Sequence, residues 1–175
     1  MTLTTHAIVG AAAASILPFN PLVAFCAGFA SHLAIDAIPH WDYVDFLPSL
    51  QQNEGDPLIN HTVSFTSKAF VRDFFVVLGD AVLGVALSVL VFSFWLFHVP
   101  LAIVLVGAVA GILPDPLQVL YWKTRAKILE PLQRLHVWVQ KGKQLQHLKP
   151  WMGLGLQCAL IVVVIASLRL LSLTP

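Results

Sequence analysis

The chain has 175 residues, of which 58% are hydrophobic and 11% are charged, and its mean hydropathy is +0.81. This composition is typical of an integral membrane protein and excludes an ordinary soluble domain. The formal net charge is +1 and there is no basic stripe, so no nucleic-acid partner is expected. Cys26 and Cys158 lie within apolar stretches, where buried hydrophobic cysteines are expected rather than a disulfide or metal thiolates.

The N-terminal region predicts two helices, at about 5 to 18 and 21 to 38, with a break at Pro18 and Pro21. It lacks the basic start of a cleavable signal, so we expect it to be retained as the first membrane segment. That first helix is short, because a full crossing needs about 20 residues.

Three further apolar stretches are long enough to cross a membrane, at about 70 to 97, 100 to 121 and 151 to 172. The expected fold class is therefore all-α: a single membrane domain, residues 1 to 175, forming a helical bundle of about five transmembrane helices.

Basic residues indicate the orientation. Lys68 and Arg72 precede the third helix, and the segment 123 to 149 is rich in Lys and Arg. The positive-inside rule places both regions, and with them the N-terminus, in the cytoplasm. The stretch 128 to 149 has helical apolar spacing and basic residues, which suit a helix lying on anionic headgroups.

An internal repeat is expected, with halves at about 4 to 43 and 78 to 122, each a helical hairpin. THAIVGAAAA aligns with GDAVLGVALS, and GFASHLAIDAIPHWDY aligns with GAVAGILPDPLQVLYW. The alignment pairs His6 with Asp80 and Asp36 with Asp115. Such a duplication would bring these ionisable groups to the cytoplasmic side.

Ionisable side chains within apolar helices point to a metal site. His32 and Asp36 are four residues apart, which places them on one helix face with about 5 to 6 Å between their Cβ atoms. A carboxylate in hydrocarbon needs a partner, and the helix interiors contain almost no Lys or Arg. We therefore expect a divalent metal, zinc or manganese, with enough ligands for two ions. The expected metal ligands are His6, His32, Asp36, Asp80 and Asp115.

Two further residues lie at the mouth of the second helix, beyond Pro39. His40 and Asp42 are the candidate catalytic residues, as general acid or base, because such groups must be free of the metal.

Structural interpretations remain open beside these roles. His32 and Asp36 would form a buried hydrogen-bonded pair, and Asp80 and Asp115 would satisfy backbone groups exposed near Gly and Pro. His6 would be an interfacial residue. His136 and His147 are explained at least as well by a solvated basic face.

The motifs THAIVG, SHLAIDAIPHWD and GILPDP resemble the bacterial inner-membrane proteins called membrane-bound metal-dependent hydrolases (YdjM-like), over roughly residues 4 to 42 and 78 to 118. The His-x-x-x-Asp pair is also similar to ligand pairs of zinc-dependent phospholipases C. The resemblance implies phosphoester hydrolysis at a metal centre with His6, His32, Asp36 and Asp115 as ligands. One stretch departs from it: members often read Pro-Asp-x-Asp-His where this chain has Pro39-His40-Trp41-Asp42.

The expected function is that of a metal-dependent hydrolase of phosphoesters in the bacterial inner membrane. It would act at the cytoplasmic leaflet, in contact with membrane lipid, and its expected substrate is a lipid phosphate. The alternative is a small transporter or metal-binding membrane protein that uses the same residues. With so few crossings, that version would require a homo-oligomer. A polar track continuing past Ser88 and Ser93 would favour transport.

Overall fold

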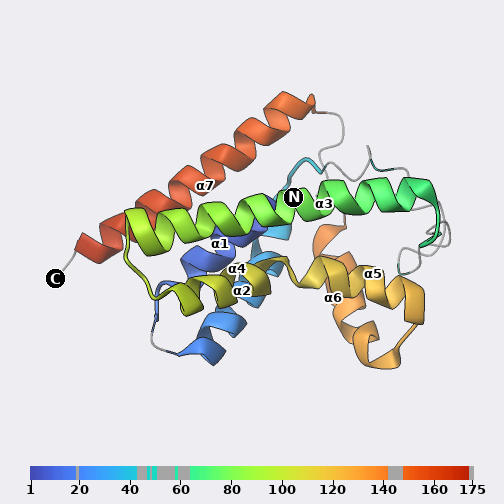
Figure 1. Cartoon of the computed structure of the whole chain (residues 1–175), viewed down its shortest axis with the longest axis horizontal. Coiled ribbons are helices and arrows are strands. Elements are labelled where there is room, and N and C mark those ends of the chain that lie inside the picture. The colour runs from blue at the N-terminus through green and yellow to red at the C-terminus, as the bar shows by residue number, and fades with distance from the viewer. Residues whose placement is uncertain are drawn as a thin grey trace.

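The computed structural model describes residues 1–18, 20–42, 47, 49–50, 58, 64–141 and 148–173. The regular elements in these residues are helices, arranged as a bundle with α1 near its centre (Figure 1). In chain order they are α1 (Leu3–Ala14), α2 (Pro21–Asp36), α3 (Lys68–Ser88), the π-helix η2 (Val89–Trp95), α4 (Leu101–Ile112), α5 (Pro114–Thr124), the 3₁₀-helix η3 (Lys127–Leu129), α6 (Glu130–Gln140) and α7 (Pro150–Leu173).

The ends of α1 and α2 follow from local sequence. The Thr2 hydroxyl caps α1 by accepting from the amide of Thr5, and the Asn20 side chain caps α2 by accepting from the amide of Leu22. Pro21 occupies the start of α2, where its missing N–H leaves no gap in the helix. The helix ends at Asp36, three residues before Pro39, so Asp36 lies in its last turn.

Two helices in the described ranges are long and apolar enough to cross a membrane, Lys68–Trp95 and Pro150–Ser172. A third span results if α4 and α5 form one crossing, although they are bent by 44° at the Pro114 break. The count is therefore two or three, below the five expected. The reason is length: α1 has 12 residues and α2 has 16, short of the about 20 that a full crossing needs.

Small residues let the central helices approach closely. A Cβ atom added to Gly10 would lie 2.9 Å from the Cα of Gly111, and one added to Gly107 would lie 2.8 Å from the carbonyl oxygen of Gly10. Gly28 on α2 meets the backbone of Gly107 as well. Packing through glycines of this kind is typical of helices in membranes, where close backbone contact replaces the hydrophobic effect as a source of stability.

A buried amide connects α7 to the N-terminal part of the chain. The side chain of Gln157 accepts hydrogen bonds from the amide of Thr2 (2.9 Å) and the hydroxyl of Thr5 (3.0 Å). Its NH₂ group donates to the carbonyl of Trp41 (3.0 Å). One side chain thus holds α7 against α1 and against the segment that follows α2.

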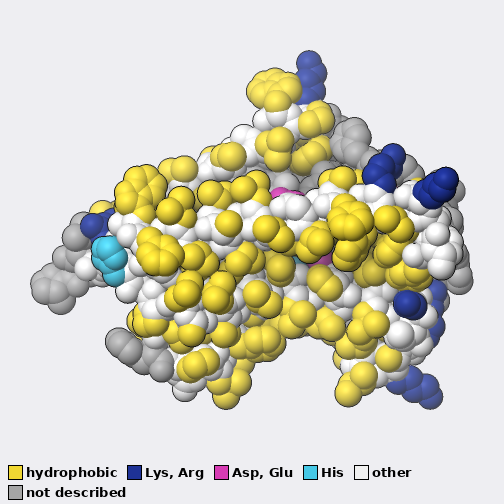
Figure 2. Space-filling model, in the orientation of Figure 1, with side chains coloured by type: hydrophobic (Ala, Val, Ile, Leu, Met, Phe, Trp, Pro, Cys, Tyr) yellow, Lys and Arg dark blue, Asp and Glu magenta, His cyan; other side chains and the backbone are white. Residues whose placement is uncertain are grey.

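The outer surface is largely apolar, and hydrophobic side chains cover most of the face in Figure 2. Phe75, Trp95 and Val162 are each more than 60% exposed, which suits contact with lipid chains. Cys26 and Cys158 are free thiols on this surface. The prediction that they are buried inside the protein is therefore wrong, because the faces of α2 and α7 that carry them point away from the bundle.

Candidate metal centre

Four side chains from three different parts of the chain converge at one buried point. They are His32 and Asp36 on α2, Asp115 on α5 and His136 on α6. One ligand atom from each lies within 4.8 Å of those of the other three. His32, Asp36 and His136 are at most 1% exposed, and the Asp115 side chain is 31% exposed. The group is therefore closed on the inside and open on the side of Asp115.

The separations within the group match a metal coordination shell. Nε2 of His136 lies 3.1 Å from Oδ2 of Asp36, and Nε2 of His32 lies 3.3 Å from the same oxygen. Oδ1 of Asp115 lies 3.4 Å from Nε2 of His32 and 3.5 Å from Nε2 of His136. Ligand atoms about 2.0 to 2.1 Å from a tetrahedral zinc lie about 3.3 Å from one another. These four separations are thus close to those between the ligand atoms of a tetrahedral zinc.

Hydrogen bonds around the group orient the ligand atoms. Nδ1 of His32 lies 2.7 Å from the carbonyl oxygen of Gly111, which can only accept, so Nδ1 carries a proton, and in the neutral ring Nε2 presents a lone pair to the centre. The NH₂ group of Gln140 donates to Oδ2 of Asp36 at 2.8 Å. Outer partners of this kind fix ring orientation and carboxylate position in metal sites.

Local sequence explains why these side chains meet. Pro39 follows shortly after the end of α2, which leaves Asp36 in the last turn of that helix. Pro114 begins α5, so Asp115 lies in the first turn of the next helix. His136 lies on the buried face of α6 with Gln133 and Val139, while Ile128 and Trp138 nearby are 87% and 73% exposed.

The other predicted ligands lie in two places. His6 is fully buried beside the group, with its Nε2 3.2 Å from Oδ1 of Asp36 and its ring stacked on that of His32. Asp80 lies outside the group, at the N-terminus of α1. Its carboxylate accepts from the amide of Leu3 at 2.6 Å and from the hydroxyl of Thr4 at 2.6 Å. Asp80 thus satisfies backbone groups at a helix start, as the structural interpretation predicted.

The predicted acid-base residues lie at the rim of the group. Nε2 of His40 lies 3.9 Å from Oδ1 of Asp36, and Oδ2 of Asp42 lies 3.6 Å from the amino group of Met1. Burial, followed by the positive charge of Met1, holds the pKa of His40 below its usual range. Although burial opposes it, the carboxylates of Asp42 and Asp36 raise the pKa of the Met1 amino group.

His136 is the member of the group that the sequence did not single out as a metal ligand. In α6 the residues Gln133, His136 and Gln140 recur at helical spacing, and the structure places Gln133 and His136 inside. The polar stripe formed by these three residues is the feature of the sequence that could have indicated His136. His147, the other histidine for which a solvated face was expected, lies outside the described residues. Of the residues paired by the expected repeat, Asp36 and Asp115 share the group, whereas His6 contacts Asp36 and Asp80 contacts the start of α1.

Comparison with family models, with curated proteins and with solved structures finds no match to this chain.

Proposed function

We propose that this protein is a membrane-embedded, metal-dependent hydrolase of phosphoesters, as its resemblance to the membrane-bound metal-dependent hydrolases implies. The observation that supports the proposal most is the convergence of His32, Asp36, Asp115 and His136 on one buried point. Two imidazoles and two carboxylates suit zinc or manganese better than calcium or magnesium, which prefer oxygen ligands.

The proposed chemistry follows from that donor set. A bound divalent ion would lower the pKa of a coordinated water toward neutrality and offset negative charge on a phosphoryl oxygen. The chain's own contribution is to hold the ligands in place and to admit substrate at Asp115, the exposed member of the group. Asp42 at the rim, with 10% of its side chain exposed, is the candidate to take up or release a proton.

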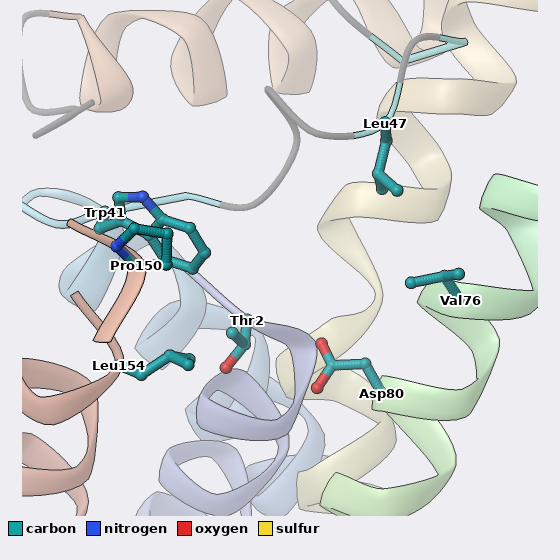
Figure 3. A pocket seen from close by; sticks show the side chains of 7 residues that line it. All are labelled: Thr2, Trp41, Leu47, Val76, Asp80, Pro150 and Leu154. Carbon is teal, nitrogen blue, oxygen red and sulfur yellow. The ribbon is translucent and has the colours of Figure 1, made fainter. Parts of the chain in front are cut away.

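A groove beside the rim favours a substrate with an acyl chain. It has a volume of about 460 Å³ and is lined mostly by apolar side chains (Figure 3). Its lining residues are Thr2, Trp41, Leu47, Val76, Asp80, Pro150 and Leu154. Thr2 and Trp41 are the chain neighbours of Met1 and Asp42, which form an ion pair at the rim. A lipid phosphate would place its headgroup at the metal centre and its chain in this groove.

The membrane setting is consistent with this substrate. Ile128 and Trp138 are exposed apolar residues beside and on α6, the helix that carries His136. An amphipathic helix with such residues lies well at a headgroup boundary. In the proposed orientation the N-terminus is cytoplasmic and the site faces the cytoplasmic leaflet of a bacterial inner membrane.

A polar track that continues outward past Ser88 and Ser93 would favour the transport alternative. Ser88 is buried, but its hydroxyl donates to the carbonyl of Gly84 within its own helix at 2.8 Å. The surrounding core is apolar and includes Ala11, Phe92 and Val104, which are fully buried. These contacts favour a site confined to one end of the bundle, and therefore the hydrolase.

The test is phosphate release from a lipid phosphate in mixed micelles by purified protein supplied with zinc or manganese. We expect Asp36→Ala and Asp115→Ala to abolish release, whereas His98→Ala, distant from the site, retains the wild-type rate. Wild-type rates in both aspartate variants would contradict the proposal.

A further inference from the structure

The carboxylate of Asp36 has two differently occupied sides. Its Oδ2 atom faces the four-residue group and receives the hydrogen bond from Gln140. Its Oδ1 atom points the other way, toward two further histidines. Nε2 of His6 lies 3.2 Å from Oδ1, and Nε2 of His40 lies 3.9 Å from it. One carboxylate therefore stands between two sets of imidazole nitrogens.

The polar atoms on the Oδ1 side lack hydrogen-bond partners among the described residues. They are Oδ1 of Asp36, Nε2 of His40, and both ring nitrogens of His6. His6 is 0% exposed and His40 is 2% exposed. Leaving a buried donor or acceptor unpaired costs about 1 to 3 kcal/mol, so the unpaired atoms of these three side chains require an explanation. A ligand between them supplies it.

The ring orientation of His40 presents a lone pair rather than a proton toward Oδ1 of Asp36. Nδ1 of His40 lies 2.8 Å from the carbonyl oxygen of Ile38, so Nδ1 donates and Nε2 is left as an acceptor toward Oδ1. The ring of His6 stacks on that of His32 with centroids 3.9 Å apart and planes 19° from parallel. The stacked rings present their Nε2 atoms to opposite oxygens of Asp36.

We propose that a second divalent cation binds between Oδ1 of Asp36, Nε2 of His6 and Nε2 of His40, with Asp36 bridging two metal ions. This inference rests on the proposed function, since the first ion is the one held by the four-residue group. A bridging carboxylate suits two ions about 3.5 to 4 Å apart, as in two-metal hydrolases. His40 is then a ligand of the second ion, and Asp42 alone remains the candidate general acid or base at the rim.

Positive charge is already drawn to this side of Asp36. The amino group of Met1 lies 3.7 Å from Oδ1 of Asp36 and 3.6 Å from Oδ2 of Asp42. The competing explanation is that this ammonium alone balances the carboxylates on the Oδ1 side. The two explanations differ in the number of metal ions that the protein binds.

The experiment loads the full-length protein in detergent with manganese(II), removes free ions, and measures metal per chain together with the electron paramagnetic resonance spectrum. We expect two ions per wild-type chain and an exchange-coupled spectrum. His6→Gln and His40→Gln should each retain one ion and show the simple six-line signal of isolated manganese. His98→Gln, whose ring lies far from the site, is the matched control and should behave as wild type.

The outcomes separate this inference from the function on which it rests. The second site would be overturned, and the first left intact, by the following result. The wild-type chain binds one ion with an uncoupled signal, and this ion is lost in His136→Gln but unchanged in His6→Gln. Two uncoupled ions would also overturn it, because a shared carboxylate couples them. A wild-type protein that binds no manganese or zinc would overturn both. The metal content and the spectrum of the wild-type protein decide between one site and two, even where a variant fails to fold.

Discussion

Nε2 of His136 lies 3.1 Å from Oδ2 of Asp36, although 100 residues separate them in the chain. The contact brings α6, an amphipathic helix, onto the end of α2 and completes the four-residue group that could hold a metal ion. Because α6 also carries the exposed Trp138, the same short helix combines a buried member of this group with a surface suited to the membrane.

The first prediction concerns His136 as a ligand. Replacing it with alanine removes one of four ligand atoms, and the affinity for zinc should fall by more than about a hundredfold, because even outer-shell partners are worth about 10- to 100-fold. Competition with a chromophoric chelator measures this affinity. Arg134→Ala, on the exposed side of the same helix, should leave it unchanged. Equal affinity in the two variants would remove His136 from the site.

Gln140 is predicted to act on the metal site through its hydrogen bond to Asp36, without being a ligand itself. Its NH₂ group donates to Oδ2 of Asp36, so Gln140→Ala frees that carboxylate to rotate and should weaken zinc binding about 10- to 100-fold while leaving the number of bound ions unchanged. The same chelator titration, combined with elemental analysis, distinguishes a weaker site from a missing one. A change in stoichiometry, or no change in affinity, would contradict the role.

The sequence predicted one part of this site and missed another for a physical reason. His32 and Asp36 are neighbours on one helix, so their spacing alone predicts that they share a face. His136 reaches the same point only through the packing of α6 against α2, a long-range contact that spacing along the chain does not encode. Basic residues close to it, such as Arg134, made a solvated face equally plausible.

The number of spans was overestimated for a related reason. Apolar composition predicts α1 and α2 as helices of a membrane protein, but it does not distinguish a crossing from a short helix buried against other helices. Ala7, Ala11 and Ala14 on α1 are at most 1% exposed, so that helix is apolar because it packs inside the protein. Hydropathy alone gives the same signal in both cases.

The glycine contacts give a prediction about stability. Gly107→Ala places a Cβ atom against the backbone of α1, 2.8 Å from the carbonyl oxygen of Gly10, and should lower the free energy of unfolding by about 1 to 3 kcal/mol. Gly79→Ala is the matched control, because a Cβ atom there meets nothing within 4 Å. It should be neutral or stabilising by up to about 1 kcal/mol, the helix propensity of alanine over glycine. Thermal denaturation in detergent compares them, and an equal loss in both would contradict the close crossing.

Asp80 provides a prediction that separates a helix cap from a metal ligand. Asp80→Asn removes the charge that stabilises the first amides of α1, so the free energy of unfolding should fall by about 1 to 2 kcal/mol. Because Asp80 lies outside the four-residue group, the manganese content of the folded variant should equal that of wild type. Asp36→Asn serves as the comparison, since it should lose metal. A loss of metal in Asp80→Asn as large as in Asp36→Asn would return Asp80 to the ligand set.

The groove gives the last prediction, which tests the lipid substrate. Leu154 lines the groove, so Leu154→Trp fills part of its volume and should raise KM for a long-chain lipid phosphate by about tenfold, the equivalent of excluding roughly two methylene groups at about 0.8 kcal/mol each. The rate constant for a short-chain soluble phosphoester should not change, because that substrate reaches only the metal centre. Leu156→Trp, two residues along α7 and outside the groove lining, is the control and should leave both substrates unaffected. An equal effect of Leu154→Trp on the long and short substrates would indicate damage to the metal centre itself, and no effect on either would exclude the groove as the acyl-chain site.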